Sequence, residues 1–96
     1  MKETVSIVIP TYNEKDNITP LVERIAKALD GRPYEIIIVD DNSKDGTIDI
    51  ADSLASRYPV KLFVRRDEKG LATAVIHGIK HAAGSIVCVM DADLQH

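Results

Sequence analysis

The sequence predicts an α/β fold, with a mostly parallel sheet that carries helices on both faces. Two observations point to it. Four short apolar runs rich in β-branched residues alternate along the chain with three amphipathic helical patterns, and three of the four runs lack polar alternation. Strands without polar alternation are typical of a sheet covered on both faces. The alternation of strands and helices requires right-handed crossovers and therefore predicts a doubly wound parallel sheet.

The four apolar runs define the expected strands. They cover residues 5–9, 36–39, 60–64 and 86–90. Cys88, inside the last run, is expected to be an inert core thiol. No helical pattern follows this run, so we expect its strand to present an exposed apolar edge.

The first helical pattern covers residues 18–29, where apolar residues recur at three- and four-residue spacing. Asn17 or Thr19 is the expected N-cap, Pro20 lies in the first turn, and Gly31 stands just past the end. These signals predict a helix that packs one apolar face on the sheet.

Two further helical patterns follow. The second covers residues 48–58, comes after Asp45 and is stopped by Pro59. The third covers residues 71–82, and Gly84 is expected to close it as a left-handed C-terminal residue.

Length, composition and charge narrow the functional classes. The chain has 96 residues, a formal net charge of −3, 45% hydrophobic and 4% aromatic residues, which suits one compact domain. The acidic balance and the scarcity of aromatics argue against nucleic-acid binding. No run approaches the roughly 20 apolar residues of a membrane helix, and the first 15 residues lack a signal-peptide layout. A single cysteine excludes an internal disulfide.

The loops at the carboxyl ends of the strands are the expected ligand site, because ligands of open parallel sheets bind there, near the point where strand order reverses. These loops cover residues 10–14, 40–43, 65–70 and 91–95. Three of the four are rich in carboxylate or amide oxygens. We expect the first and fourth strands to be neighbours, because their loops grip one ligand only when the strands are adjacent.

The last loop carries paired carboxylates. Asp91 and Asp93 are two residues apart at the end of an extended segment, so both side chains leave the chain on one face. Two carboxylates on one face share a cation or a proton, and oxygen ligands suit Mg²⁺ or Mn²⁺. Gln95 offers a further oxygen. The alternative is an acidic loop whose carboxylates cap a following turn.

The first two loops offer contacts to a nucleoside. Of the adjacent pair Asp40 and Asp41, we expect Asp41 to contact the ligand and Asp40 to cap the turn, although both also suit turn and N-cap chemistry. Pro10 gives a stiff exit from the first strand. Tyr12 provides a ring that can stack on a base, and Glu14 can accept hydrogen bonds from hydroxyl groups.

The third loop leads into the third helix. Lys69 and Gly70 stand at its expected start, where free amides and the helix dipole favour an anion such as phosphate. Arg65 and Arg66 are interpreted as a solvated pair rather than a phosphate clamp. The spacing of His77 and His81 matches a zinc-binding pair, but residue 78 is glycine where a zinc protease has glutamate, so we interpret both as structural or surface residues.

Four motifs stand in order along the chain: Pro10-Thr11-Tyr12-Asn13-Glu14, the stretch from Val39 to Thr47, Lys69-Gly70-Leu71, and the stretch from Met90 to His96. With these motifs the chain resembles glycosyltransferase family 2 over essentially all its residues. Within that family it is most similar to enzymes that act on polyprenyl phosphates. The resemblance implies a GT-A fold, of which residues 1–96 would be the N-terminal nucleotide-sugar-binding part, ending after the Asp-x-Asp loop.

The resemblance also implies an activity. It is the inverting transfer of a hexose, foremost mannose from GDP-mannose, to a polyprenyl phosphate such as dolichyl phosphate, with Mg²⁺ or Mn²⁺ as cofactor. The longer enzyme would work at the cytoplasmic face of a membrane, with membrane contacts supplied by later segments, and a homo-oligomer is compatible with this. The 96-residue chain alone is expected to carry no catalytic residue and to be inactive.

Site residues follow from the same resemblance. The residues that would bind the nucleotide sugar are Pro10, Tyr12, Glu14, Val39, Asp41, Gly70, Asp91, Ala92 and Asp93. Within this set, Asp91 and Ala92 would lie along the ribose and diphosphate. The metal ion would be bound by Asp93 and Gln95, with Asp91 as a further ligand.

Two alternative functions stay open at this point. One is another family 2 transferase, for example with UDP-glucose as donor. The other is a phosphatase of the haloacid dehalogenase type, in which Asp91 would be the nucleophile and Asp93 the acid/base. The phosphatase motif normally follows the first strand of its core and has Thr or Val where this chain has Gln95.

Overall fold

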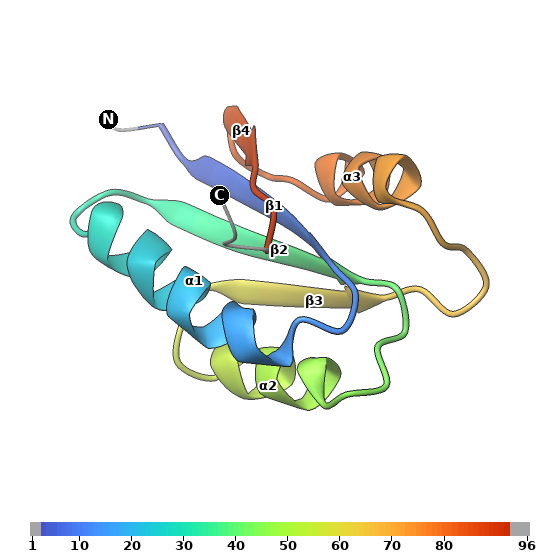
Figure 1. The fold of residues 1–96 in the computed structure, drawn as a ribbon. Coiled ribbons are helices and arrows are strands. Elements are labelled where there is room, and N and C mark those ends of the chain that lie inside the picture. Colours follow the sequence, from blue (N-terminus) through green and yellow to red (C-terminus); the bar gives the residue numbers. More distant parts are fainter. Residues whose placement is uncertain (1–2, 93–96) are drawn as a thin grey trace.

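The computed structural model describes residues 3–92, which form an α/β fold in the order β1-α1-β2-α2-β3-α3-β4 (Figure 1). The strands are β1 (Val5–Thr11), β2 (Tyr34–Asp40), β3 (Val60–Val64) and β4 (Ile86–Val89). The helices are α1 (Lys15–Ala28), α2 (Thr47–Ala55) and α3 (Leu71–Lys80). The predicted class and element order are confirmed.

The four strands form one parallel sheet in the order β3-β2-β1-β4. The chain therefore moves outward from β1 to β3 and then returns to the other side of β1. This reversal confirms the predicted adjacency of the first and fourth strands. It places the loops that follow β1 and β4 side by side at the carboxyl edge, where ligands of such sheets bind.

Each face of the sheet has its own apolar core. On one face, α1 and α2 cover odd-numbered β1 residues such as Ile7 and Ile9, and on the other face α3 covers Val8 and Val39 (Figure 1). The helix α3 approaches the sheet through Gly78, where an added Cβ atom would collide with the side chain of Val8. The small residues of α3 therefore permit close packing of helix on sheet.

The start of α1 differs from its prediction. Neither Asn17 nor Thr19 is the N-cap: the helix begins at Lys15 with Glu14 as the preceding residue, so Pro20 lies inside it rather than in its first turn. The reason is tertiary. The backbone N–H groups of Glu14 and Lys15 donate to Thr47 Oγ1 at 2.9 Å and to Asp45 Oδ2 at 3.3 Å. The side chains of Asp45 and of Thr47, the first residue of α2, thus satisfy amides that a local cap would otherwise serve.

Gly84 does not close α3 in the left-handed conformation, since the described glycines with positive φ are Gly31, Gly46 and Gly70. A close approach explains the glycine instead. A Cβ atom at residue 84 would lie 2.5 Å from the carbonyl oxygen of Thr4 and 2.6 Å from Ser6 Oγ. The segment between α3 and β4 therefore packs directly against the first strand.

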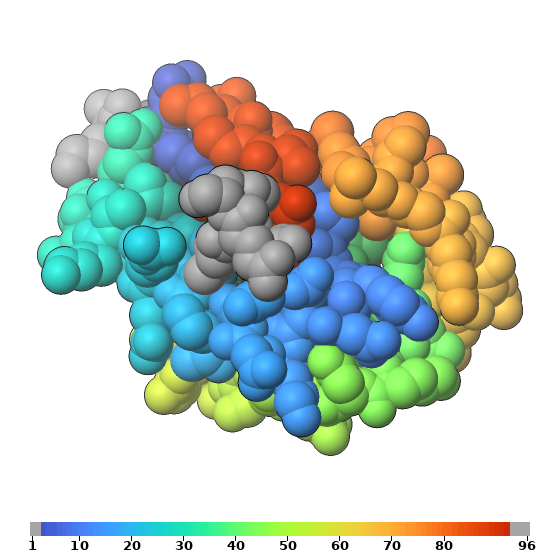
Figure 2. All heavy atoms as spheres, in the orientation of Figure 1, coloured from blue at the N-terminus to red at the C-terminus, as the bar shows by residue number. Residues whose placement is uncertain are grey.

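The last strand lies at the surface, as expected for an edge strand. Val87 and Val89 are 40% and 49% exposed, and Figure 2 shows the atoms of β4 at the surface of the molecule. Cys88 is exposed as well, so its prediction as a core thiol was wrong. It pairs with Ile7 in register, and its position on the edge strand leaves its side chain exposed. Within residues 3–92, no helix is long and apolar enough to cross a membrane.

Candidate functional site

Two adjoining cavities lie at the carboxyl edge of the sheet. The first has a volume of about 310 Å³, and its lining consists of Pro10, Thr11, Tyr12, Glu14, Asp41, Leu71 and Asp91. The second, of about 250 Å³, is lined by Tyr12, Asp41, Lys69 and Gly70. Because Tyr12 and Asp41 line both, the cavities form one continuous site. The structure thus brings together residues from all four predicted loops.

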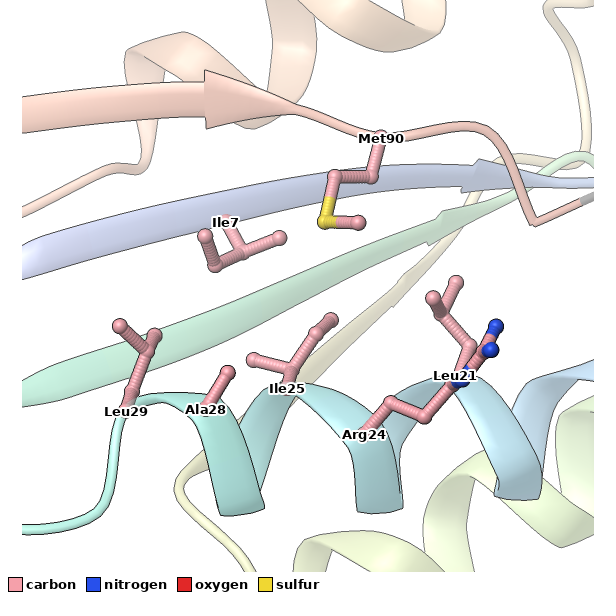
Figure 3. A pocket seen from close by; sticks show the side chains of 7 residues that line it. All are labelled: Ile7, Leu21, Arg24, Ile25, Ala28, Leu29 and Met90. Carbon is pink, nitrogen blue, oxygen red and sulfur yellow. The ribbon is translucent and has the colours of Figure 1, made fainter.

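An apolar groove of about 390 Å³ lies elsewhere, between α1 and the side of the sheet that holds β1 and the edge strand β4 (Figure 3). Met90 and Ile7 face Leu21, Ile25 and Ala28 of α1 and its C-cap Leu29 across it, and Arg24 is the one charged residue among the described residues of its lining. Among the described residues that line it, no side chain offers a carboxylate or amide oxygen. We therefore place the candidate site at the carboxyl edge.

Asp41 occupies the centre of the site and is held by Arg65. The Arg65 Nε and Nη2 groups donate to Asp41 Oδ1 and Oδ2 at 2.8 and 3.1 Å. The backbone N–H of Gly70 also donates to Oδ2, at 3.0 Å. The carboxylate is therefore fixed by a bidentate ion pair and by the residue that precedes α3.

Arg65 is not the solvated residue that we expected. It is 7% exposed, and it also donates to Thr73 Oγ1 at 2.9 Å and to the Gly70 carbonyl at 3.0 Å. The hydrogen bonds to Asp41 raise the pKa of this guanidinium. Arg66 is exposed and donates to Asn42 Oδ1. A sequence signal was available for Arg65: it follows β3 at the same step at which Asp41 follows β2.

Asp40 caps the turn after β2, as predicted. Its Oδ1 accepts hydrogen bonds from the hydroxyls of Thr11 and Ser43, both at 2.6 Å, and its Oδ2 accepts the N–H of Ser43 at 2.7 Å. Asp40 is fully buried. The division of roles between the two adjacent aspartates follows from strand alternation, which turns neighbouring side chains to opposite faces.

The loop after β1 is joined to the loop after β2. The N–H of Asn13 donates to Ser43 Oγ at 2.8 Å, and Asn13 Oδ1 accepts the N–H of Lys44 at 3.0 Å. This places the ring of Tyr12, which is 51% exposed, at the mouth of both cavities. The Lys69 ammonium lies 5.7 Å from the centre of that ring, within range of a cation–π interaction.

Two predicted residues do not line either cavity, and two more are not described by the structure. Val39 and Ala92 are fully buried in the two cores, so their contacts with a nucleotide sugar stay a prediction. Asp93 and Gln95 lie outside the described residues. Asp91 lines the first cavity together with Glu14 and Asp41.

The donors that a divalent metal ion would need are carboxylate and amide oxygens, which the predicted ligands Asp91, Asp93 and Gln95 carry. Within residues 3–92 there is no cluster of three or more His, Cys, Asp or Glu residues suited to a metal ion. Asp91 is exposed and turned to the cavity that contains two further carboxylates. Oxygen ligands of this kind suit Mg²⁺ or Mn²⁺, and the remaining predicted ligands follow Asp91 directly in the sequence.

His77 of α3 and His81, the C-cap of that helix, form an aromatic cluster with Phe63. The rings of His77 and His81 stack with centroids 4.5 Å apart, and Phe63 lies 5.4 and 4.4 Å from them. Burial, and then the neighbouring His81 and Arg65, lower the pKa of His77. His77 is half-buried and His81 is exposed, which agrees with the prediction that both are structural or surface residues.

The sequence of the chain was compared with models of known protein families. The model of glycosyl transferase family 2 matches residues 6–96. The chain belongs to this family. Membership decides against the phosphatase alternative, and it agrees with a site of convergent carboxylates at the switch point of a parallel sheet.

Two curated relatives align with nearly the whole length of this chain. The chain is 55% identical over 92 residues to a dolichol-phosphate mannosyltransferase of Pyrococcus furiosus, covering 96% of the chain and 26% of the relative. It is 43% identical to the dolichol-phosphate mannosyltransferase of Saccharomyces cerevisiae, covering 95% of the chain and 36% of the relative. The chain therefore spans about a quarter to a third of the length of these relatives.

Solved glycosyltransferases share the fold. A mannosyltransferase of Pyrobaculum calidifontis, in complex with GDP-Man and Mn²⁺, superposes with a TM-score of 0.83 at 30% identity, covering 97% of this chain and 28% of the neighbour. S. aureus TarS in complex with UDP-GlcNAc also gives 0.83 at 30% identity, covering 97% of this chain and 27% of TarS. The fold is thus that of the GT-A glycosyltransferases, as predicted.

Proposed function

We propose that this chain is the donor-binding part of an inverting glycosyltransferase that moves mannose from GDP-mannose to a polyprenyl phosphate such as dolichyl phosphate. One observation carries the proposal: Pro10, Tyr12, Glu14, Asp41 and Asp91, from three separate loops, line one cavity in a family 2 chain. The names of the curated relatives support mannose and dolichol phosphate. The GDP-Man complex of one structural neighbour supports the guanine nucleotide.

The site residues take different parts of the donor in this proposal. Tyr12 and Asp41 contact the nucleoside, Glu14 accepts hydrogen bonds from hydroxyl groups, and Asp91 lies along the ribose and diphosphate. Gly70 closes the nucleoside end of the site, where its amide already donates to Asp41. In this arrangement the nucleoside lies at the end of the site near Arg65, and the charged diphosphate lies near Asp91.

Asp91, Asp93 and Gln95 would hold a divalent ion, Mg²⁺ or Mn²⁺. When bound, such an ion neutralises the charge that develops on the departing nucleoside diphosphate. Two structural neighbours were solved with Mn²⁺, which supports a divalent ion without deciding between the two metals. A phosphate acceptor is already ionised, so the reaction demands little general-base assistance.

The acceptor and the place of action rest on the names of the relatives. A polyprenyl phosphate resides in a membrane, and nucleotide sugars are cytoplasmic substrates, so we place the reaction at the cytoplasmic face of a membrane. Contacts with the membrane, and any homo-oligomer, belong to the remaining length of the enzyme, which is about two to three times that of this chain in the relatives. The 96-residue chain is accordingly expected to bind donor without transferring it.

Calorimetry with GDP tests the donor half. Binding is expected to strengthen with MnCl₂ or MgCl₂, and Asp93→Ala should remove this metal dependence. Asp41→Ala should weaken binding with or without metal, because its carboxylate contacts the nucleoside. Asp52→Ala, on the exposed face of α2, is the matched control. Binding of GDP that ignores both the metal and Asp41 would contradict the assignment.

A transfer assay tests the whole proposal. A polypeptide that continues this sequence to the length of the relatives is incubated with labelled GDP-mannose, Mg²⁺ and dolichyl phosphate. Label should enter the organic phase, and Asp91→Asn or Asp93→Asn should prevent this. If label moves from UDP-glucose instead, the family assignment holds and the mannose assignment is wrong.

A further inference from the structure

Arg65 connects the separate segments that build the nucleoside end of the site. Its guanidinium contacts the Asp41 carboxylate, the Gly70 carbonyl and the Thr73 hydroxyl. These partners belong to the end of β2, the residue before α3 and the first turn of α3. Its own backbone N–H donates to the carbonyl of Asp40 at 2.8 Å. One side chain thus joins three elements at the wall of the cavity.

Arg65 stands behind the wall and does not line the site. It appears in the lining of neither carboxyl-edge cavity, whereas Asp41 and Gly70 line the second one. With 7% of its surface exposed, Arg65 is shielded from a ligand by the residues that it holds. Any influence on the ligand must therefore pass through Asp41 and Gly70.

The hydrogen bonds from Arg65 and Gly70 leave the Asp41 carboxylate with one free acceptor site. A carboxylate has about four lone-pair sites, and three are engaged by Arg65 Nε, Arg65 Nη2 and the Gly70 amide. Two of these donors contact Oδ2 and one contacts Oδ1. The remaining acceptor site lies on Oδ1, the oxygen that Gly70 does not contact.

We propose that Arg65 is a positioning residue that orients Asp41 so that Oδ1 presents one acceptor to a single N–H or O–H donor of the nucleoside. The same guanidinium ties Gly70 and the start of α3 to that carboxylate. The role rests on the proposed function, because it assumes that a nucleoside occupies the cavity. Lysine keeps the charge but cannot make the two parallel hydrogen bonds that hold the carboxylate plane.

The experiment compares Arg65→Lys with Arg66→Lys, its exposed neighbour, as the matched control. Two probes are titrated by calorimetry into the 96-residue chain: GDP with MnCl₂, which reports the nucleoside and diphosphate together, and inorganic pyrophosphate with MnCl₂, which reports the diphosphate alone. Arg65→Lys should weaken GDP binding at least about tenfold, as expected for loss of charged hydrogen bonds. It should leave pyrophosphate binding unchanged, and Arg66→Lys should change neither.

A double-variant cycle separates positioning from general destabilisation. If Arg65 acts through Asp41, then Arg65→Lys added to Asp41→Asn costs no further GDP affinity. Should Arg65→Lys fail to fold by circular dichroism, Thr73→Val keeps Arg65 and removes its Nη1 partner, together with the hydrogen bond from the Thr73 hydroxyl to the Gly70 carbonyl. That variant should also weaken GDP but not pyrophosphate.

The outcomes are distinct. The positioning role is overturned if Arg65→Lys, or Thr73→Val where it is used, loses equal affinity for GDP and for pyrophosphate. It is also overturned if the unmodified chain binds GDP and the variant binds GDP with the same affinity. If the unmodified chain binds neither probe, the proposed function fails, and the role of Arg65 fails with it. If it binds pyrophosphate but not GDP, the nucleoside site and this role fail while the metal–diphosphate assignment survives.

Discussion

Glu35 offers a quantitative test of the fold at the end of the sheet opposite the site. Its Oε2 accepts the Ser6 hydroxyl and the Ala83 N–H, both at 2.6 Å, and Lys61 Nζ lies 3.0 Å from Oε1. Ser6 Oγ in turn accepts the N–H of Gly84 at 2.8 Å. The carboxylate therefore fastens the α3–β4 connection to β1 and β2. We predict that Glu35→Gln destabilises the protein and flattens its stability at acidic pH.

The magnitude follows from the pKa of Glu35. Burial by itself would raise this pKa, but the hydrogen bonds from Ser6, Ala83 and Lys61 lower it from 4.5 to about 2. The difference of about 2.5 corresponds to about 3 kcal/mol, at about 1.4 kcal/mol for each tenfold change. Because the folded-state pKa is depressed, this stability is present above about pH 4.5 and is lost as the pH falls toward about 2.

The assay is urea unfolding followed by circular dichroism between neutral pH and about pH 2. Glu35→Gln should lose stability at neutral pH and show a shallower decline below about pH 4.5 than the unmodified chain. Glu23→Gln, at an exposed position of α1, is the control. The lowered pKa of His77 costs stability below about pH 6.5, where the unfolded state takes up its proton first, and that contribution is shared by all three proteins. An acid decline in Glu35→Gln as steep as in Glu23→Gln would refute the reasoning.

Three further outcomes are expected. Thr47→Val removes the buried hydroxyl that accepts the Glu14 N–H, so the free energy of unfolding in urea should fall by about 1–3 kcal/mol, and no change would contradict long-range capping of α1. Gly84→Ala should lower it by about 1–3 kcal/mol, because the new Cβ meets the Thr4 carbonyl oxygen; stability equal to the unmodified chain would show that the segment can shift. Cys88 should react with a thiol reagent in the folded protein, and reaction only after unfolding would return it to the core.

Local patterns predicted the strands because their signal is local. The runs of β-branched residues mark the centres of the strands, and the predicted positions agree with β1 to β4 within a few residues. The strand β1 extends beyond its predicted end at residue 9, because Pro10 still pairs with Val39 and Thr11 with Asp40. Pro10 carries no strand signal of its own, and Thr11 stands after it, outside the apolar run. Pairing in the sheet, rather than side-chain preference, decides where β1 stops.

The candidate site was predictable in part because the sheet topology concentrates ligand contacts at the carboxyl ends of strands. Tyr12, Asp41 and Asp91 were found in this way, and all three line the first cavity. Arg65 was missed because two consecutive arginines after a strand resemble a solvated pair. Its partner Asp41 is 24 residues away in sequence, and only the pairing of β2 with β3 brings them together.

By itself the sequence determined the class of fold, the order of its elements, the loops that meet at the site and the resemblance to family 2, because periodicity and turn chemistry act over a few residues. The tertiary structure decided which residues of those segments cap the helices, pack closely and hold the site together. The cap of α1 comes from Thr47, 33 residues beyond Glu14, and the constraint on Gly84 comes from Ser6, 78 residues before it. A buried amide or charge takes whichever partner the packed chain brings within reach, and that partner has no signature in the local sequence.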